Sequence, residues 1–181
     1  MLYFATRGFA GTKISELAAF IGIGQGTLYS YFKSKENLFQ EIYKRINRDS
    51  DIEQLKLLSF LPISAEKKIH KLTDTIMEKL ENDETFAAVI ALNTPMLLEQ
   101  DADFSMNNTT YQIPLYEYTA KIIKQGQKQG RVVAGNPLKL ADYYWGVVYL
   151  YSMKKLFTTK YEMISSADLE RTLLKGERNH E

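Results

Sequence analysis

Apolar residues recur along most of this chain at the three- and four-residue spacing that is typical of amphipathic helices. Alternating apolar and polar positions, the pattern of a half-buried strand, are not found. The sequence therefore predicts an all-α fold. Four apolar stripes carry this prediction: Leu38, Phe39, Ile42 and Ile46; Ile69, Leu72, Ile76 and Leu80; Ile113, Tyr116, Ala120 and Ile123; and Leu138, Ala141, Trp145, Val148 and Ser152.

Capping residues, glycine and proline predict where the helices begin and end. A side-chain oxygen at the N-cap accepts a bond from the first helical turn, and proline is favoured just after it. Helix starts are expected at Ser34, Ser64, Thr94 with Pro95, Asn136 with Pro137, and Ser165, which has capping-box spacing to Asp168. Breaks near Pro62, at residues 82–83, across 100–108 and at 130–136 then divide the chain into about eight or nine helices.

Residues 8–38 fit three short helices joined by tight turns. Thr12 is a suitable N-cap for the first, which ends at Gly22, and only residues 22–24 precede the next, from about Gln25 to Phe32. A short glycine-containing turn between two short helices is the signature of a helix-turn-helix, whose second helix enters the major groove of DNA.

The predicted second helix divides its side chains in a way that suits DNA. Leu28 and Phe32 face the core, which leaves short polar residues on the opposite face for base edges and tyrosines on its flanks for phosphates. Lysines before and after this helix add phosphate attraction. The expected DNA-binding residues are Thr12, Lys13, Gln25, Gly26, Thr27, Tyr29, Ser30, Tyr31, Lys33 and Lys35.

Charge is unevenly distributed although the whole chain carries a net charge of only +1. Residues 1–48 have seven basic and three acidic side chains, a net charge of +4, whereas residues 49–181 have a net charge of −3. This asymmetry indicates that only the N-terminal part meets a polyanion. We name residues 1–48 the head and 49–181 the body, and expect a helix-turn-helix DNA-binding domain and an effector-binding and dimerisation domain, respectively.

The composition argues against several other functions. The chain has no cysteine and only two histidines, His70 and His180, so thiol chemistry and a paired-His metal site are not expected, and neither is any cofactor. The longest apolar stretch, residues 143–153, has eleven residues, whereas a membrane-spanning helix needs about 20. We expect a cytoplasmic protein without membrane association that is not an enzyme.

From Phe4 to Leu38 the head has the pattern F-A-x-x-G-F, then Thr, I-x-E-L-A and G-x-x-x-G-T-L-Y-x-Y-F-x-S-K-E-x-L. This pattern resembles the DNA-binding region of the tetracycline-repressor (TetR) family of bacterial transcriptional regulators. The resemblance implies a homodimer that binds a pseudo-palindromic operator in double-stranded DNA. It further implies a body that binds a small molecule, whose occupation usually releases DNA; a repressor is expected.

Two features depart from the family pattern. Gly24 stands where a serine commonly caps the recognition helix, and glycine caps nearly as well. The family's first helix normally begins some ten residues before the position of Phe4, so the first helix is expected to be shortened: either the start is truncated or the protein binds DNA with a reduced basic arm.

The body offers candidate effector and dimer residues. Aromatic, Met and amide side chains on its middle helices are expected to line an apolar or aromatic effector site: Phe86, Ile90, Asn93, Met96, Tyr111, Tyr116 and Tyr143. The stretch 143–157 has little charge on any face, so one face is expected inside the subunit and the other against a partner subunit, through Tyr144, Gly146, Val148, Tyr151 and Ser152.

Two alternatives remain at this stage. The chain could be an all-α enzyme or small-molecule carrier whose N-terminal helices only pack, with carboxylate chemistry around residues 99–117. It could also be an interaction module whose basic head binds an acidic protein.

Overall fold

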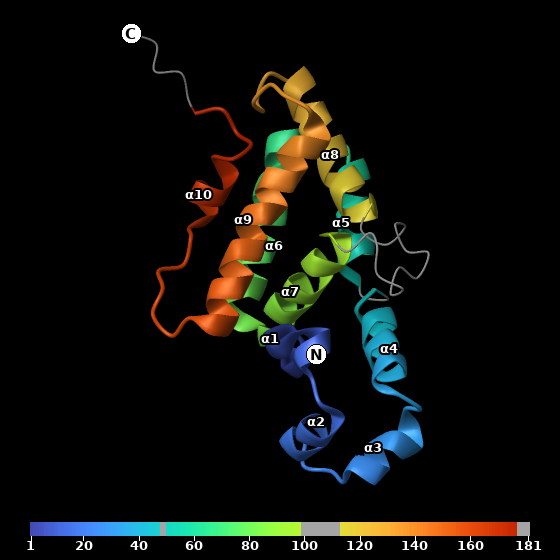
Figure 1. The fold of residues 1–181 in the computed structure, drawn as a ribbon. Coiled ribbons are helices and arrows are strands. Elements are labelled where there is room, and N and C mark those ends of the chain that lie inside the picture. Colours follow the sequence, from blue (N-terminus) through green and yellow to red (C-terminus); the bar gives the residue numbers. More distant parts are fainter. Residues whose placement is uncertain (48–49, 99–112, 177–181) are drawn as a thin grey trace. The chain divides into compact units, whose positions relative to one another are not determined.

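The computed structural model describes residues 1–47, 50–98 and 113–176, which form ten helices (Figure 1). The chain divides into two compact units, Met1–Asp49 and Ser50–Glu181, one residue from the expected boundary, and from here on head and body denote these two units. The all-α prediction is confirmed, with slightly more helices in the described ranges than the eight or nine expected.

The head consists of α1 (Leu2–Gly11), α2 (Ile14–Phe20), α3 (Gln25–Tyr31) and α4 (Lys35–Asn47). Its core forms around the fully buried Phe4, whose ring centroid lies 6.3 Å from that of Phe9 and 5.1 Å from that of Phe39. Leu17 and Leu28 are buried from α2 and α3. These short helices are held by their shared apolar core, since isolated helices of such length are marginal in water.

The start of α2 differs from the prediction. Lys13, not Thr12, is its N-cap, and the Thr12 hydroxyl donates to the Gly8 carbonyl at 2.7 Å. Gly8 has φ 68°, the left-handed region that glycine adopts without a Cβ penalty, and the helical course of α1 is interrupted there. Thr12 therefore ends α1 instead of starting α2.

The body consists of α5 (Ser50–Phe60), α6 (Ala65–Asn82), α7 (Glu84–Leu98), α8 (Ile113–Lys128), α9 (Pro137–Phe157) and α10 (Ser166–Glu170). α9 packs against both α7 and α8, and α6 contacts every other helix of the body (Figure 1). α7 can approach α9 closely because it buries three small side chains, Ala87, Ala88 and Ala91. The body's core therefore has contributions from all six helices.

Most of the predicted helix starts are confirmed. The side chains of Ser64, Asn136 and Ser165 accept backbone hydrogen bonds at the starts of α6, α9 and α10, and Ser34 accepts one from Asn37 N–H at 3.1 Å. The predicted start at Thr94 with Pro95 is wrong, because α7 continues from Glu84 to Leu98. The apolar stretch before Pro95 already has the helical period, so the proline falls within a helix. The predicted break across 100–108 lies outside the described residues.

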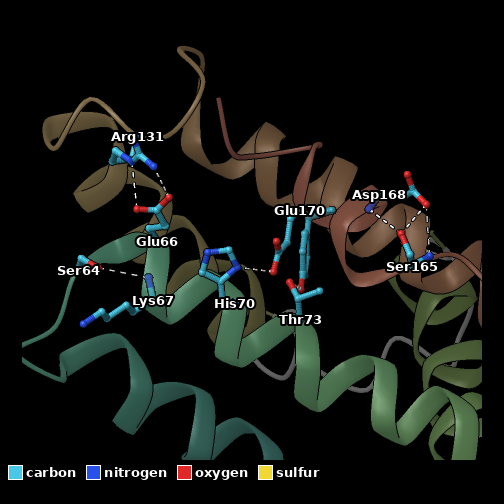
Figure 2. Close-up of polar contacts among 10 residues, drawn as sticks. Ser64, Glu66, Lys67, His70, Thr73, Arg131, Ser165, Asp168 and Glu170 are labelled. Carbon is cyan, nitrogen blue, oxygen red and sulfur yellow. Dashed lines mark hydrogen bonds and ion pairs between the residues drawn. The ribbon is translucent and has the colours of Figure 1, made fainter. Parts of the chain in front are cut away.

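The C-terminal segment and the turn between α8 and α9 are each tied to α6, the first through Glu170 and His70 and the second through Arg131 and Glu66 (Figure 2). His70 Nδ1 on α6 lies 2.7 Å from Glu170 Oε1 on α10, and Arg131 forms a two-point ion pair with Glu66 of α6. The Val133 N–H donates to the Leu173 carbonyl at 2.9 Å. Leu169 and Leu173 are fully buried, so apolar packing holds this segment and the polar contacts fix its orientation.

The described ranges contain neither a membrane-spanning helix nor a metal-binding cluster. Among the helices placed by the structure, none combines the length and the low polarity that a bilayer crossing demands. The described residues also contain no cluster of three or more His, Cys, Asp or Glu side chains arranged to hold a metal ion.

Candidate nucleic-acid interface

α2, a three-residue turn and α3 form a helix-turn-helix. Gly22 has φ 75°, which a residue with a side chain rarely adopts, and the Ile23 N–H donates back to the Ala18 carbonyl at 3.0 Å. Ala18 is buried between the packed helices, where a larger side chain would separate them. Gly24 is the N-cap of α3 without any side-chain bond. The turn thus fixes α3 through backbone geometry, as the sequence predicts.

α3 presents one buried and one exposed surface. Leu28 is 5% exposed, whereas Tyr31 is 76% exposed and Tyr29 is 46% exposed. The remaining α3 side chains are also exposed: Gln25, Thr27 and Ser30, with Gly26 between them. The structure therefore places all six predicted DNA-binding residues of α3 on the solvent side of the head.

Some of these polar groups already have partners within the head. Ser30 donates its hydroxyl to the Thr27 carbonyl at 2.6 Å, so that proton is used in a local bond. No hydrogen bond of the Gln25 side chain occurs in the part of the chain that the structure describes. Gln25 is therefore the amide with both its donor and its acceptor available at the start of α3.

Glu16 on α2 forms ion pairs with two basic side chains of the head, Lys13 and Arg7. It accepts a bond from the Tyr3 hydroxyl at 3.1 Å and pairs with Lys13 at 3.3 Å and Arg7 at 3.7 Å. Lys13 and the Tyr3 hydroxyl both hold the pKa of Glu16 below its usual value. Because the Lys13 side chain remains 74% exposed, it can reach a phosphate without leaving this position.

The structure corrects two of the predicted DNA-binding residues. Thr12 is buried and its hydroxyl is bonded to Gly8, so its side chain is not available to DNA. Lys35 donates its ammonium protons to the carbonyls of Phe9, at 3.0 Å, and Thr12, at 3.2 Å, and it lies 4.4 Å above the Phe9 ring. This lysine joins α4 to the end of α1, which no local pattern reveals. Lys33, in contrast, is exposed.

The predicted effector residues are not all brought together. Phe86 is buried in the body core, with Ile90 and Tyr116 packed against that core. Burial, with a smaller contribution from Asp142, raises the pKa of the Tyr116 phenol. The prediction that Tyr143 lines the effector site is corrected, because its side chain is 63% exposed. The remaining predicted effector residues have side chains outside the described part of the chain: Asn93, Met96 and Tyr111.

The predicted dimer residues divide between two faces of α9. The prediction is corrected for three residues that are buried within the subunit and not at its surface: Tyr144, Val148 and Ser152. The Tyr144 hydroxyl lies 3.0 Å from Thr73 Oγ1, and the Ser152 hydroxyl donates to the Val148 carbonyl. Tyr151 is half-buried and packs against the same core, whereas Gly146 is exposed.

The outward face of α9 exposes apolar side chains that sequence reasoning missed, between and beside Lys139 and Lys154. Leu150 is 50% exposed and Phe157 is 52% exposed, and with Tyr143 and Gly146 they follow the three-, four- and seven-residue spacing of one helix face. The sequence does predict two covered faces. It does not tell them apart, because apolar residues occupy both.

The chain is similar to known regulatory proteins. Residues 3–42 match the model of a family described as bacterial regulatory proteins, tetR family. This match coincides with α1, α2, α3 and the first part of α4.

Solved structures of such proteins have a similar fold over nearly the whole chain. An HlyIIR mutant protein has a TM-score of 0.69 and 18% identity, with 96% of this chain and 92% of the other covered. A TetR-family transcriptional regulator from Agrobacterium tumefaciens gives 0.68 and 12%, with coverages of 94% and 87%. The ketosteroid transcriptional regulator KstR2 of Mycobacterium tuberculosis gives 0.64 and 16%, with coverages of 96% and 90%.

Proposed function

We propose that this chain, whose residues 3–42 match the model of the tetR family of bacterial regulatory proteins, is a transcriptional repressor that binds a pseudo-palindromic operator as a homodimer and is released by a small molecule. It would act in the cytoplasm, where bacterial DNA lies. No covalent chemistry is needed for this function.

The exposed surface of α3 is the observation that carries the proposal. Gln25 and Thr27 offer short polar groups at the start of the helix, while Tyr29 and Tyr31 flank them and Lys33 follows. A recognition helix needs this order, since base edges are close at its front and phosphates run along its sides. The buried Leu28 fixes which side of α3 faces outward.

The outward face of α9 supports the homodimer. Tyr143, Leu150 and Phe157 expose apolar area that a second copy of the chain would cover. A two-fold axis would then present two copies of α3 to successive major grooves, about 34 Å apart.

An effector would act by favouring one spacing of the recognition helices over another. A ligand shifts such an equilibrium only by its difference in affinity for the two states. Phe86 lies in the body core, and Ile90 and Tyr116 pack against that core, whose apolar and aromatic character suits an effector of the same kind.

The test is selection of bound duplexes from a randomised DNA library with the purified protein at low salt, followed by sequencing. A two-fold symmetric consensus is expected. Recovery of unselected sequence would contradict DNA recognition, and a consensus without symmetry would contradict the dimer.

A further inference from the structure

The helix proposed to enter the major groove, α3, has no charged side chain. No lysine or arginine occurs between Lys13 and Lys33, so α2, the turn and α3 contain neither. In the major groove, guanine is most often read by Arg or Lys, which donate to its O6 and N7 acceptors. α3 has no side chain of this kind.

The side chains that α3 does offer suit the other base pair. The Gln25 amide is exposed and without an intramolecular hydrogen bond in the described residues, and Gln pairs in two-point fashion with the N6 and N7 of adenine. The exposed Thr27 has a methyl group, which matches the C5-methyl group of thymine. The proton of the neighbouring Ser30 hydroxyl is donated to the Thr27 carbonyl, which removes one competing donor toward a base.

Gly26 adds an independent observation. A Cβ built at this position meets no atom within 4 Å, and its φ is not in the left-handed region, so nothing inside the head requires glycine. Glycine lowers helix stability relative to alanine. A bare backbone next to Gln25 does, however, let the start of α3 approach the base edges closely.

We infer that α3 reads A·T base pairs in each half-site, through Gln25 to adenine and Thr27 to the thymine methyl group, and does not read guanine. This inference rests on the proposed function, since it names the class of operator that the same surface takes. The cations that bracket the two helices, Lys13 and Lys33, lie at their ends and would contact phosphates, which contribute affinity without base preference.

The experiment compares consensus sequences selected from the same randomised library by the wild-type protein and by three single variants. Gln25→Ala marks the contacted position, because base preference should relax there by about tenfold and nowhere else. Gln25→Arg should change the preferred pair at that position from A·T to G·C. Ser15→Arg is the matched control: it adds the same charge on the exposed face of α2 and should tighten binding without changing the consensus.

The outcomes separate the inference from the function on which it rests. A symmetric wild-type consensus with A·T at the position marked by Gln25→Ala supports both. A symmetric consensus with G·C at that position overturns the inference and leaves the regulator proposal standing. A consensus that Gln25→Ala does not change overturns the assignment of Gln25, and recovery of unselected sequence overturns the DNA-binding function together with the inference.

Discussion

Gly26 lies in the first turn of α3, where an added side chain would meet no atom of the head. We expect Gly26→Ala to raise the free energy of unfolding of the head by up to about 1 kcal/mol. The same methyl group should weaken DNA binding, because it would stand between α3 and the base edges. Thermal unfolding followed by circular dichroism and fluorescence anisotropy with the selected duplex measure the two effects.

Gly11 provides the control for this change. It is exposed in α1, and a Cβ there would lie 3.9 Å from Arg7 Cβ, an ordinary contact. Gly11→Ala should stabilise the head without affecting DNA affinity. If Gly26→Ala also left affinity unchanged, the close approach of α3 to the groove would be refuted.

Tyr144 and Tyr143 are neighbours with opposite surroundings. Tyr144 is fully buried, and burial raises the pKa of its phenol far above the usual range, so the hydroxyl stays protonated and bonded to Thr73. Tyr144→Phe should cost about 1–2 kcal/mol of unfolding free energy, because it leaves the buried Thr73 hydroxyl without this partner. Tyr143→Phe, at an exposed ring, should cost nothing measurable in the same denaturant titration. Equal effects would contradict the assignment of Tyr144 to the core.

At the scale of elements, three lysines bind the C-terminal ends of three helices. The ammonium groups of Lys35, Lys68 and Lys155 donate to carbonyls near the C-termini of α1, α5 and α6. Carbonyls at a helix C-terminus lack intrahelical donors and carry partial negative charge, so a cation there is favourable. Lys68 is the extreme case: burial, and to a smaller extent Lys121, lower its pKa. The bonds of Lys35 and Lys155 join helices that are distant in sequence, whereas that of Lys68 joins α6 to the preceding α5.

Lys35 gives a test of this joining role against the predicted phosphate role. Lys35→Met should lower the unfolding free energy of the head by about 1–2 kcal/mol, since it removes charged bonds to the Phe9 and Thr12 carbonyls. The salt dependence of DNA binding should stay unchanged. Lys33→Met should do the opposite and reduce the salt slope by about one unit. A reduced salt slope for Lys35→Met would instead support the predicted contact between Lys35 and a phosphate.

The ion pair between Glu66 on α6 and Arg131 before α9 makes the body's stability depend on pH. Arg131 holds the pKa of Glu66 below its usual value. A carboxyl whose pKa is lowered by folding stabilises the fold above its ordinary pKa, and this contribution disappears as the pH falls through the folded-state pKa. Glu66→Gln should therefore lower the melting temperature by about 1–3 °C at pH 7, and this difference should vanish in strong acid.

The control for this pair is Glu78→Gln, on the same helix. Glu78 is exposed and has no ion pair within the described ranges. Its melting temperature should match that of the wild type at both pH values. A Glu66→Gln deficit that persisted in strong acid would show that lost packing, and not charge, accounts for it.

At the scale of the whole molecule, the head was more predictable than the body. The turn at Gly22, the cap at Gly24 and the faces of α3 depend on neighbours a few residues away, so spacing alone indicates them. The position of Lys35 depends on α1, more than twenty residues distant, and local patterns contain no information about it. The prediction of the dimer residues on α9 failed for another reason, because the sequence of a helix with two apolar faces does not reveal which face packs inside its own subunit.

This ambiguity has a direct test in the oligomeric state. The outward stripe of α9 contains Leu150, which is 50% exposed, and Leu57 on α5 is 66% exposed. Leu150→Asp should convert the dimer to a monomer at micromolar concentration, because burying a charge in an apolar contact between subunits is strongly unfavourable. Leu57→Asp, an equal change on another helix, should leave the dimer intact. Sedimentation velocity distinguishes the two species.

Operator binding should follow the oligomeric state, since two copies of α3 share one symmetric site. The Leu150→Asp monomer should retain a folded body, with unchanged fluorescence of the buried Trp145, yet bind the selected duplex at least about a hundredfold more weakly. Half-site duplexes should not discriminate between this variant and the wild type, because one copy of α3 contacts each half-site. A Leu150→Asp protein that remained dimeric and bound the full operator normally would place the dimer contact on a surface other than this face of α9.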